Sequence, residues 1–246
     1  MKHLSEMSFA ELLDPRGYDC PYCGKHHTTG LKAFEAGRGV VKALPGMLKA
    51  LGIQKPFIVC DKNTMKAAGG TVEALLKEAG IPYKLYMLTA DHVEPDEFSV
   101  GAITMALDPS CDGVVAVGSG VVNDCCKVVS HAVGKPQVVV GTAPSMDGYA
   151  SDSSSMHVNS VKSTLYNACP VGILCDSEIM SQAPMRMLWA GLGDMIAKYV
   201  SVCEWRIANL IIGEEYCEEI AGLMRASVEK IVENAQCLAS RDPEAI

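Results

Sequence analysis

Apolar and polar positions alternate in blocks along most of the chain. After an irregular opening, short apolar runs rich in β-forming residues occur at 55–61, 81–88, 112–118 and 137–141. Between them, segments with helical spacing cover 64–79, 95–107 and 121–133. Apolar strands without a polar face, alternating with helices, predict a parallel α/β sheet covered on both faces.

The pattern changes after residue 141. Residues 142–155, TAPSMDGYASDSSS, predict a long polar loop, and residues 161–176 are mixed and more β-like. Helical patterns cover the chain after residue 176. We therefore place a domain boundary near residue 175, with an α/β domain over 1–175 and a partial helical domain over 176–246. Two amphipathic helices cannot bury both their faces, so they must pack on the first domain, on a partner or on further sequence.

Composition narrows the possible partners and the compartment. The 246 residues are 49% apolar and 20% charged, which is typical of a globular protein. A net charge of -8 argues against general nucleic-acid binding but not against a small anionic substrate. The chain has no signal-like amino terminus and no apolar run of about 20 residues, so we expect a cytoplasmic protein outside the membrane. Most of the eleven cysteines lie in apolar runs, which favours reduced, buried thiols.

The segment VVAVGSGVVNDCCK, residues 114–127, carries the strongest chemical signal. A predicted strand runs through Gly118-Ser119-Gly120 directly into a helix. Glycines let the backbone approach a ligand, and the N–H groups at a helix amino terminus bind phosphate. A plain strand-to-helix turn is the simpler interpretation, and the segment is not the Gly-x-Gly-x-x-Gly fingerprint because position 123 is Asn.

Two further segments accompany this turn. Asp61 ends the run 55–61, where a carboxylate could bind the ribose hydroxyls of a dinucleotide. It could equally cap the helix that follows. The loop TAPSMDGYAS, residues 142–151, follows the next strand, and polar loops at strand ends of α/β proteins often carry function.

VGSGVVND, TAPSMDGYAS and AGLGDMIAKY together resemble the signature segments of AraM-type bacterial glycerol-1-phosphate dehydrogenases. That family is part of a wider group of dehydroquinate synthase-like and metal-dependent alcohol dehydrogenases. The resemblance, from about Asp61 to Trp205, implies a Rossmann-like parallel-sheet nucleotide-binding domain followed by the start of an all-helical domain. It also implies hydride transfer between NAD(P)H and dihydroxyacetone phosphate, which gives glycerol-1-phosphate, with a divalent metal (zinc or nickel) in the cleft. We expect a homodimer.

The resemblance assigns roles to individual residues. Asp147 matches a substrate-binding acid, and Lys198, one turn after Asp194, is expected in the catalytic group. Asp194 matches the first metal ligand, although an Asp/Lys pair at this spacing is more often a surface ion pair. The residues assigned to the cofactor are Asp61, Gly118, Ser119, Gly120, Val121, Val122, Thr142, Ala143, Pro144, Ser145 and Ser151.

One part of the family pattern is missing. The family completes its metal site with two histidines downstream of the Asp194 position, whereas this sequence has no histidine after His157. We therefore expect a truncated form of a longer enzyme, with negligible turnover of its own. The alternatives are a glycerol or other polyol dehydrogenase or cyclase-like relative of the same group, and a non-catalytic nucleotide-binding remnant.

The segment CPYCGKHH, residues 20–27, raises a separate question. Cys20 and Cys23 have the spacing of a zinc-binding turn, and His26 or His27 could add a third ligand. The next cysteine, Cys60, is far along the chain, so a fourth ligand is missing nearby. A tight turn without metal is therefore favoured over a structural zinc site.

Overall fold

The computed structural model describes residues 3–244. The strands are β1 (Tyr18–Asp19), β2 (His26–His27), β3 (Ala33–Gly37), β4 (Pro56–Asp61), β5 (Lys84–Leu88), β6 (Gly113–Gly118), β7 (Gln137–Gly141), β8 (Ser153–Val158), β9 (Val161–Tyr166) and β10 (Gly172–Asp176). The helices are η1 (Leu4–Glu6), α1 (Phe9–Leu12), η2 (Val40–Ala43), α2 (Leu44–Ala50), α3 (Lys62–Thr64), η3 (Met65–Gly69), α4 (Gly70–Glu78), α5 (Glu97–Ala106), α6 (Gly120–Ala132), η4 (Gly148–Ala150), α7 (Ser177–Ser181), α8 (Met185–Ile196), α9 (Lys198–Ile212), α10 (Glu218–Glu233) and α11 (Ala235–Ala239).

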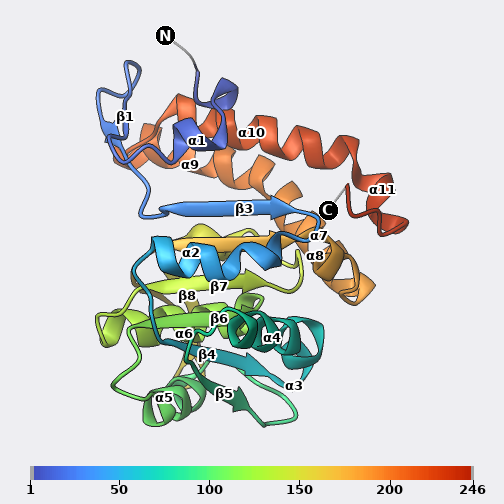
Figure 1. Ribbon diagram of the computed structural model, residues 1–246. Helices are drawn as coiled ribbons and strands as arrows, with labels where there is room; N and C mark the ends of the chain where they lie inside the picture. The colour runs from blue at the N-terminus through green and yellow to red at the C-terminus, as the bar shows by residue number, and fades with distance from the viewer. Residues whose placement is uncertain (1–2, 245–246) are drawn as a thin grey trace.

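A six-stranded sheet in the order β3-β10-β7-β6-β4-β5 forms the centre of the molecule (Figure 1). Every neighbouring pair in it is parallel, so the predicted α/β class is confirmed. Alternate residues of β4 point to opposite faces: Phe57 and Val59 pack with α5 and α6, while Ile58 and Cys60 pack with α2 and α4. Both faces are therefore apolar, as the strand pattern predicted.

The structure departs from the sequence prediction in two places. The irregular opening contains β3, which pairs with β10, and the short helix α2. The last three residues of the predicted loop, 153–155, are in β8 and pair with β9. Ser154 and Met156 are both buried, so the strand does alternate, but small hydroxyl side chains hid the alternation from the sequence.

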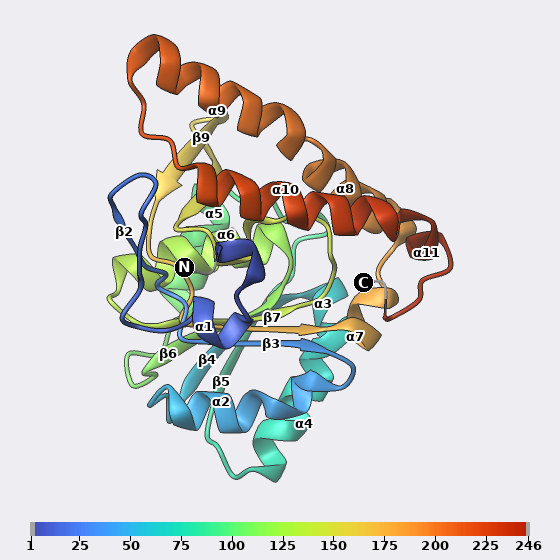
Figure 2. The same ribbon diagram turned by 90° about the horizontal axis from the view of Figure 1, so that it is seen from above.

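Helices α9 and α10 lie beyond the β3 edge of the sheet, next to the amino-terminal segment (Figures 1 and 2). Helix α10 packs against η1, α8 and α9. Helix α9 has no buried residue within the described chain, and Val200, Leu210, Ile211 and Ile212 on it are exposed. None of the described helices is long and apolar enough to cross a bilayer.

Candidate functional site

The order of the strands places a crevice at the carboxyl ends of β4 and β6. The chain goes from β4 outward to β5 and then returns to the other side of β4 to form β6. In open α/β sheets, ligands bind where the direction of strand addition reverses. Asp61 ends β4 and Gly118 ends β6, so both border this reversal.

The Gly118-Ser119-Gly120 turn leads into α6, as the sequence predicted. A Cβ on Gly118 would lie 2.6 Å from Cβ of Val122, so glycine there permits close packing of strand and helix. A Cβ on Gly120 would meet nothing closer than 3.7 Å, so packing does not require glycine at that position. Ser119 makes no side-chain cap, and the first N–H groups of α6 have no acceptor within the helix. The turn therefore offers free backbone donors.

A cleft of about 760 Å³ opens in front of this turn. Its lining includes six of the residues assigned to the cofactor, namely Asp61, Ser119, Val121, Val122, Thr142 and Ala143. The cationic side chains Lys62, Lys66 and Arg186 line it together with the carboxylates of Asp61 and Asp91. Lys62 pairs with Asp91 at 2.7 Å, so the cationic groups exceed the carboxylates of the lining by one, although the chain as a whole is negative. Lys62, Lys66 and Arg186 were not predicted from the sequence, because no distinctive spacing marks them.

Asp61 serves as a helix cap and also faces the cleft. Its Oδ1 accepts hydrogen bonds from the N–H groups of Asn63 at 2.7 Å and Thr64 at 2.8 Å. Within residues 3–244 no hydrogen bond reaches its Oδ2. The two sequence interpretations of Asp61 are therefore compatible, because capping occupies only one carboxylate oxygen.

Two buried side chains hold the loop at 142–151. The Lys127 ammonium donates to the carbonyl oxygens of Gly148 at 2.8 Å and Ser153 at 2.9 Å, and to Oγ of Ser151 at 2.8 Å. The Tyr149 hydroxyl donates to the carbonyl oxygen of Ala143 at 2.7 Å. Burial lowers the pKa of Lys127 and raises that of Tyr149. The Ser151 side chain is therefore bound to Lys127 and is not part of the cleft lining.

The sequence analysis missed both of these positioning residues. A lysine inside the run CCKVV is a signal that could have revealed the first, since a charged side chain among apolar ones on a helix must find buried partners.

Helix α8 contacts the same loop at its other end. A Cβ on Gly191 would lie 1.9 Å from the carbonyl oxygen of Pro144, so only glycine permits this approach. A small cavity of about 130 Å³ lies beside the contact, and Pro144, Asp147 and Gly191 are among its lining residues. Glycine is a poor helix former, and α8 contains two of them, Gly191 and Gly193. The close approach to the loop explains Gly191, whereas a Cβ on Gly193 would meet nothing within 4 Å.

Asp147, Asp194 and Lys198 come together as one charged group. Nζ of Lys198 lies 2.8 Å from Oδ2 of Asp147 and 3.6 Å from Oδ1 of Asp194. Oδ2 of Asp194 accepts from the backbone N–H of Asp147 at 2.9 Å. Burial opposes the charged form of both Asp194 and Lys198, yet their partners prevail: the pKa of Asp194 is lowered and that of Lys198 is raised. The group joins the loop to α8 and α9, and is more than a pair within one helix.

The residues around Asp194 do not by themselves form a metal site. Within residues 3–244, no third His, Cys, Asp or Glu donor joins Asp147 and Asp194 as a metal-binding group. A catalytic zinc typically has about three protein ligands. The Lys198 ammonium already pairs with both carboxylates and offsets one of their two negative charges. The role of Asp194 as a metal ligand therefore stays a prediction.

The fold agrees with comparison to known proteins. The family model described as iron-containing alcohol dehydrogenase matches residues 35–184, more than half of the chain. The chain therefore belongs to the iron-containing alcohol dehydrogenase family.

Within that family, the chain is similar to glycerol-1-phosphate dehydrogenases whose names specify NAD(P)+. It is 29% identical to the one from Halalkalibacterium halodurans over 228 residues, which cover 91% of this chain and 57% of the relative. It is 28% identical to the one from Pyrococcus horikoshii over 211 residues, with 85% and 60% covered. The chain thus spans little more than half the length of these curated relatives.

Solved structures share the fold at lower sequence identity. The NADH-dependent butanol dehydrogenase A from Thermotoga maritima superposes with a TM-score of 0.71 at 17% identity, covering 91% of this chain and 61% of that one. A probable glycerol dehydrogenase from Sinorhizobium meliloti 1021 gives 0.69 at 21% identity, covering 83% and 56%. These likenesses confirm the Rossmann-like architecture.

Proposed function

We propose that this chain forms the nucleotide-binding part, and the start of the helical part, of an NAD(P)-dependent sn-glycerol-1-phosphate dehydrogenase. The observation that carries the proposal is the Gly118-Ser119-Gly120 turn. This turn begins α6 at the cleft that the carboxylate of Asp61 also lines. The names of the relatives support glycerol-1-phosphate as one member of the substrate pair. Oxidation of its secondary hydroxyl gives the other member, dihydroxyacetone phosphate. In the whole enzyme the cofactor supplies the hydride, and the protein positions cofactor and substrate.

The proposed roles follow the geometry of the site. The free N–H groups of Gly120 and its neighbours bind the pyrophosphate, and Oδ2 of Asp61 accepts from a ribose hydroxyl. Residues 142–145 line the nicotinamide side. Asp147 and Lys198 contact the substrate, and Asp194 contributes one ligand to a divalent metal. The two-domain division near residue 175, the homodimer and the cytoplasmic location stay predictions.

Replacing Gly120 with valine is expected to weaken NADH binding at least tenfold, equivalent to about 1.4 kcal/mol. The Cβ of the new side chain would lie 3.7 Å from its nearest protein atom, an ordinary van der Waals contact, so the branched side chain is expected to intrude on the ligand and leave the fold intact. Fluorescence titration of NADH measures the effect. Gly101→Val is the matched control, because Gly101 is also helical and also has open space around its Cβ position. Equal NADH affinity for wild type and Gly120→Val would remove the turn from the cofactor site.

The substrate class can be tested on the NADH complex of the same chain. Dihydroxyacetone phosphate is expected to bind at least tenfold more tightly than dihydroxyacetone or glycerol, because its phosphate forms charge-assisted hydrogen bonds that a hydroxyl cannot. Calorimetric titration of each compound into the complex measures this difference. Tighter binding of glycerol would instead favour a polyol dehydrogenase.

A further inference from the structure

The turn between β1 and β2 presents two thiols on the same side. The N–H of Gly24 donates to the carbonyl oxygen of Cys20 at 2.9 Å, and the N–H of Cys20 donates to that of Lys25 at 2.8 Å. Gly24 has a φ of 71°, a left-handed conformation that favours glycine. His27, on β2, points toward the same place, and its Nε2 lies 3.2 Å from Sγ of Cys23. The CPYCGKHH segment thus supplies three potential metal ligands from one hairpin.

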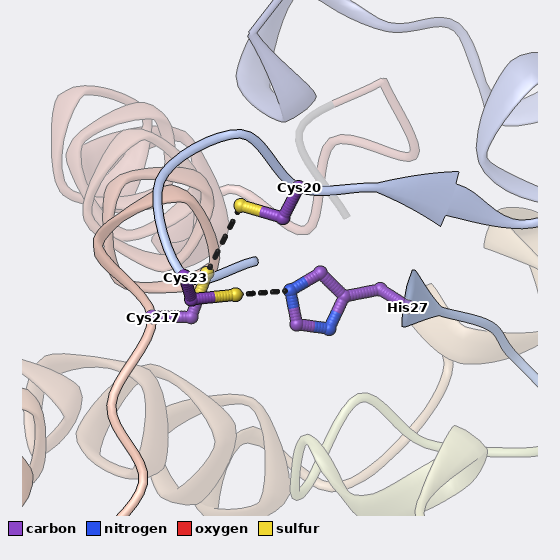
Figure 3. A group of neighbouring side chains, drawn as sticks. All are labelled: Cys20, Cys23, His27 and Cys217. Carbon is purple, nitrogen blue, oxygen red and sulfur yellow. Dashed lines mark hydrogen bonds between the residues drawn. The ribbon is translucent and has the colours of Figure 1, made fainter. Parts of the chain in front are cut away.

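A fourth potential ligand comes from the opposite end of the sequence. Cys217 immediately precedes α10, and its Sγ lies 3.7 Å from Sγ of Cys20 (Figure 3). The ligand atoms of Cys20, Cys23, His27 and Cys217 all lie within 4.8 Å of one another. Around tetrahedral zinc, with Zn–S near 2.3 Å and Zn–N near 2.0 Å, neighbouring ligand atoms are roughly 3.5–3.8 Å apart. The group therefore has nearly the size of a zinc site.

Two simpler explanations fit the geometry less well. A disulfide between Cys20 and Cys217 requires sulfurs about 2.05 Å apart, much closer than the observed 3.7 Å, and would leave Cys23 and His27 unused. Ordinary core thiols pack among apolar side chains, as Cys125 and Cys126 do. Cys20 and Cys217 are only 3% and 4% exposed, yet neither belongs to an apolar cluster of the described chain.

We propose that Cys20, Cys23, His27 and Cys217 bind one structural zinc ion. Three thiolates and one imidazole in a tetrahedral arrangement select zinc, and four protein ligands leave no open position for substrate. The site therefore has no part in hydride transfer. The proposal differs from the expectation of a tight turn without metal. That expectation rested on the absence of a fourth ligand close in sequence, and Cys217 offers one from far along the chain.

The proposed zinc site would join the amino-terminal hairpin to the carboxy-terminal helices. Other contacts already cross the same interface: Glu219 accepts from Nδ1 of His3 at 2.9 Å and from the N–H of Leu4 at 3.2 Å, and Lys25 pairs with Glu215. A metal that links residues so distant in sequence stabilises the folded state, because the unfolded chain does not preform the site.

Metal analysis of the reduced chain, purified after exposure to a slight excess of Zn²⁺, tests the proposal. Wild type is expected to hold about one zinc per chain, and Cys217→Ser and Cys23→Ser less than about a tenth of that. Cys203→Ser and Cys237→Ser are matched controls, since both cysteines are exposed and outside the group, and they should retain the metal. Asp194→Ala should also retain it, which separates this zinc from any metal at the proposed active site.

Cobalt substitution of the wild-type chain gives a second measurement that does not depend on whether a variant folds. Co²⁺ should give the intense ligand-field bands of a tetrahedral site together with thiolate-to-cobalt charge transfer, and both should disappear on addition of Zn²⁺. A weak octahedral spectrum, no zinc in the reduced wild type, equal zinc in Cys217→Ser and Cys203→Ser, or a Cys20–Cys217 disulfide in the purified protein would each overturn the proposal.

Discussion

Replacing Lys127 with alanine is expected to lower the free energy of unfolding by about 3–5 kcal/mol. The Lys127 side chain is fully buried, and its ammonium holds two carbonyl oxygens and one hydroxyl of the segment 148–153. Removing it leaves the Ser151 hydroxyl, with its single proton, as the remaining donor to the two carbonyl oxygens. It also leaves the Asp124 carboxylate, 3.5 Å from the ammonium, without its counter-charge and opens a cavity on α6. The same loop supplies Thr142 and Ala143 to the lining of the cleft, so NADH binding should weaken as well. Thermal and denaturant unfolding, together with NADH titration, measure both effects.

Two variants separate the loss of hydrogen bonds from the loss of packing and from the loss of any lysine. Lys127→Met keeps most of the packing of the aliphatic chain but not the hydrogen bonds, so most of the loss should remain. Lys77→Ala removes an ammonium that is 67% exposed and lies 3.6 Å from Glu73, and should change stability by less than about 1 kcal/mol. If Lys127→Ala were as stable as Lys77→Ala, the buried ammonium would not organise the loop.

Gly191→Ala is expected to destabilise the protein by about 1–3 kcal/mol, although alanine is the better helix former. The new methyl group would be placed 1.9 Å from the Pro144 carbonyl oxygen, and this neighbour is backbone that cannot turn away. Helix α8 or the loop must therefore shift, which would also disturb the contact between Asp147 and Asp194.

Gly193→Ala provides the control with the opposite sign. It lies two residues further along α8 with no atom within 4 Å of its Cβ position, so the substitution should stabilise the helix by up to about 1 kcal/mol. Denaturant unfolding of both variants gives the comparison. Two variants of equal stability would show that α8 does not approach the loop as closely as described.

Local sequence pattern was sufficient to predict the centre of the fold. The runs at 55–61, 112–118 and 137–141 correspond closely to β4, β6 and β7, because strands buried on both faces are continuously apolar. The same logic missed β3, in which the exposed Glu35 interrupts a half-buried edge strand. The turn proposed to bind the cofactor could be predicted as a strand-to-helix turn because its glycines and the following helix are contiguous in the sequence.

Contacts between distant segments could not be predicted in this way. Cys20 and Cys217 are separated by 197 positions, and no spacing rule relates them until α10 is placed beside the hairpin. The resemblance placed Asp147 and Lys198 at the same site, but their direct ion pair was not predicted, since it depends on how closely Gly191 lets α8 approach the loop. Local patterns determine elements, whereas such sites depend on packing.

The position of β3 has a consequence for the order in which the chain can fold during synthesis. β3 is an edge strand that pairs with β10 alone in the six-stranded sheet, and Asp176, at the end of β10, accepts from the N–H groups of Gly39 and Val41. The 135 positions between Val41 and Asp176 take a ribosome roughly 7–27 s to translate. β4 to β7 can pair with one another in that interval. β3 is therefore synthesised early but cannot pair until β10 has been made. The three proposed zinc ligands of the amino-terminal hairpin cannot form the complete site until Cys217 has been made as well.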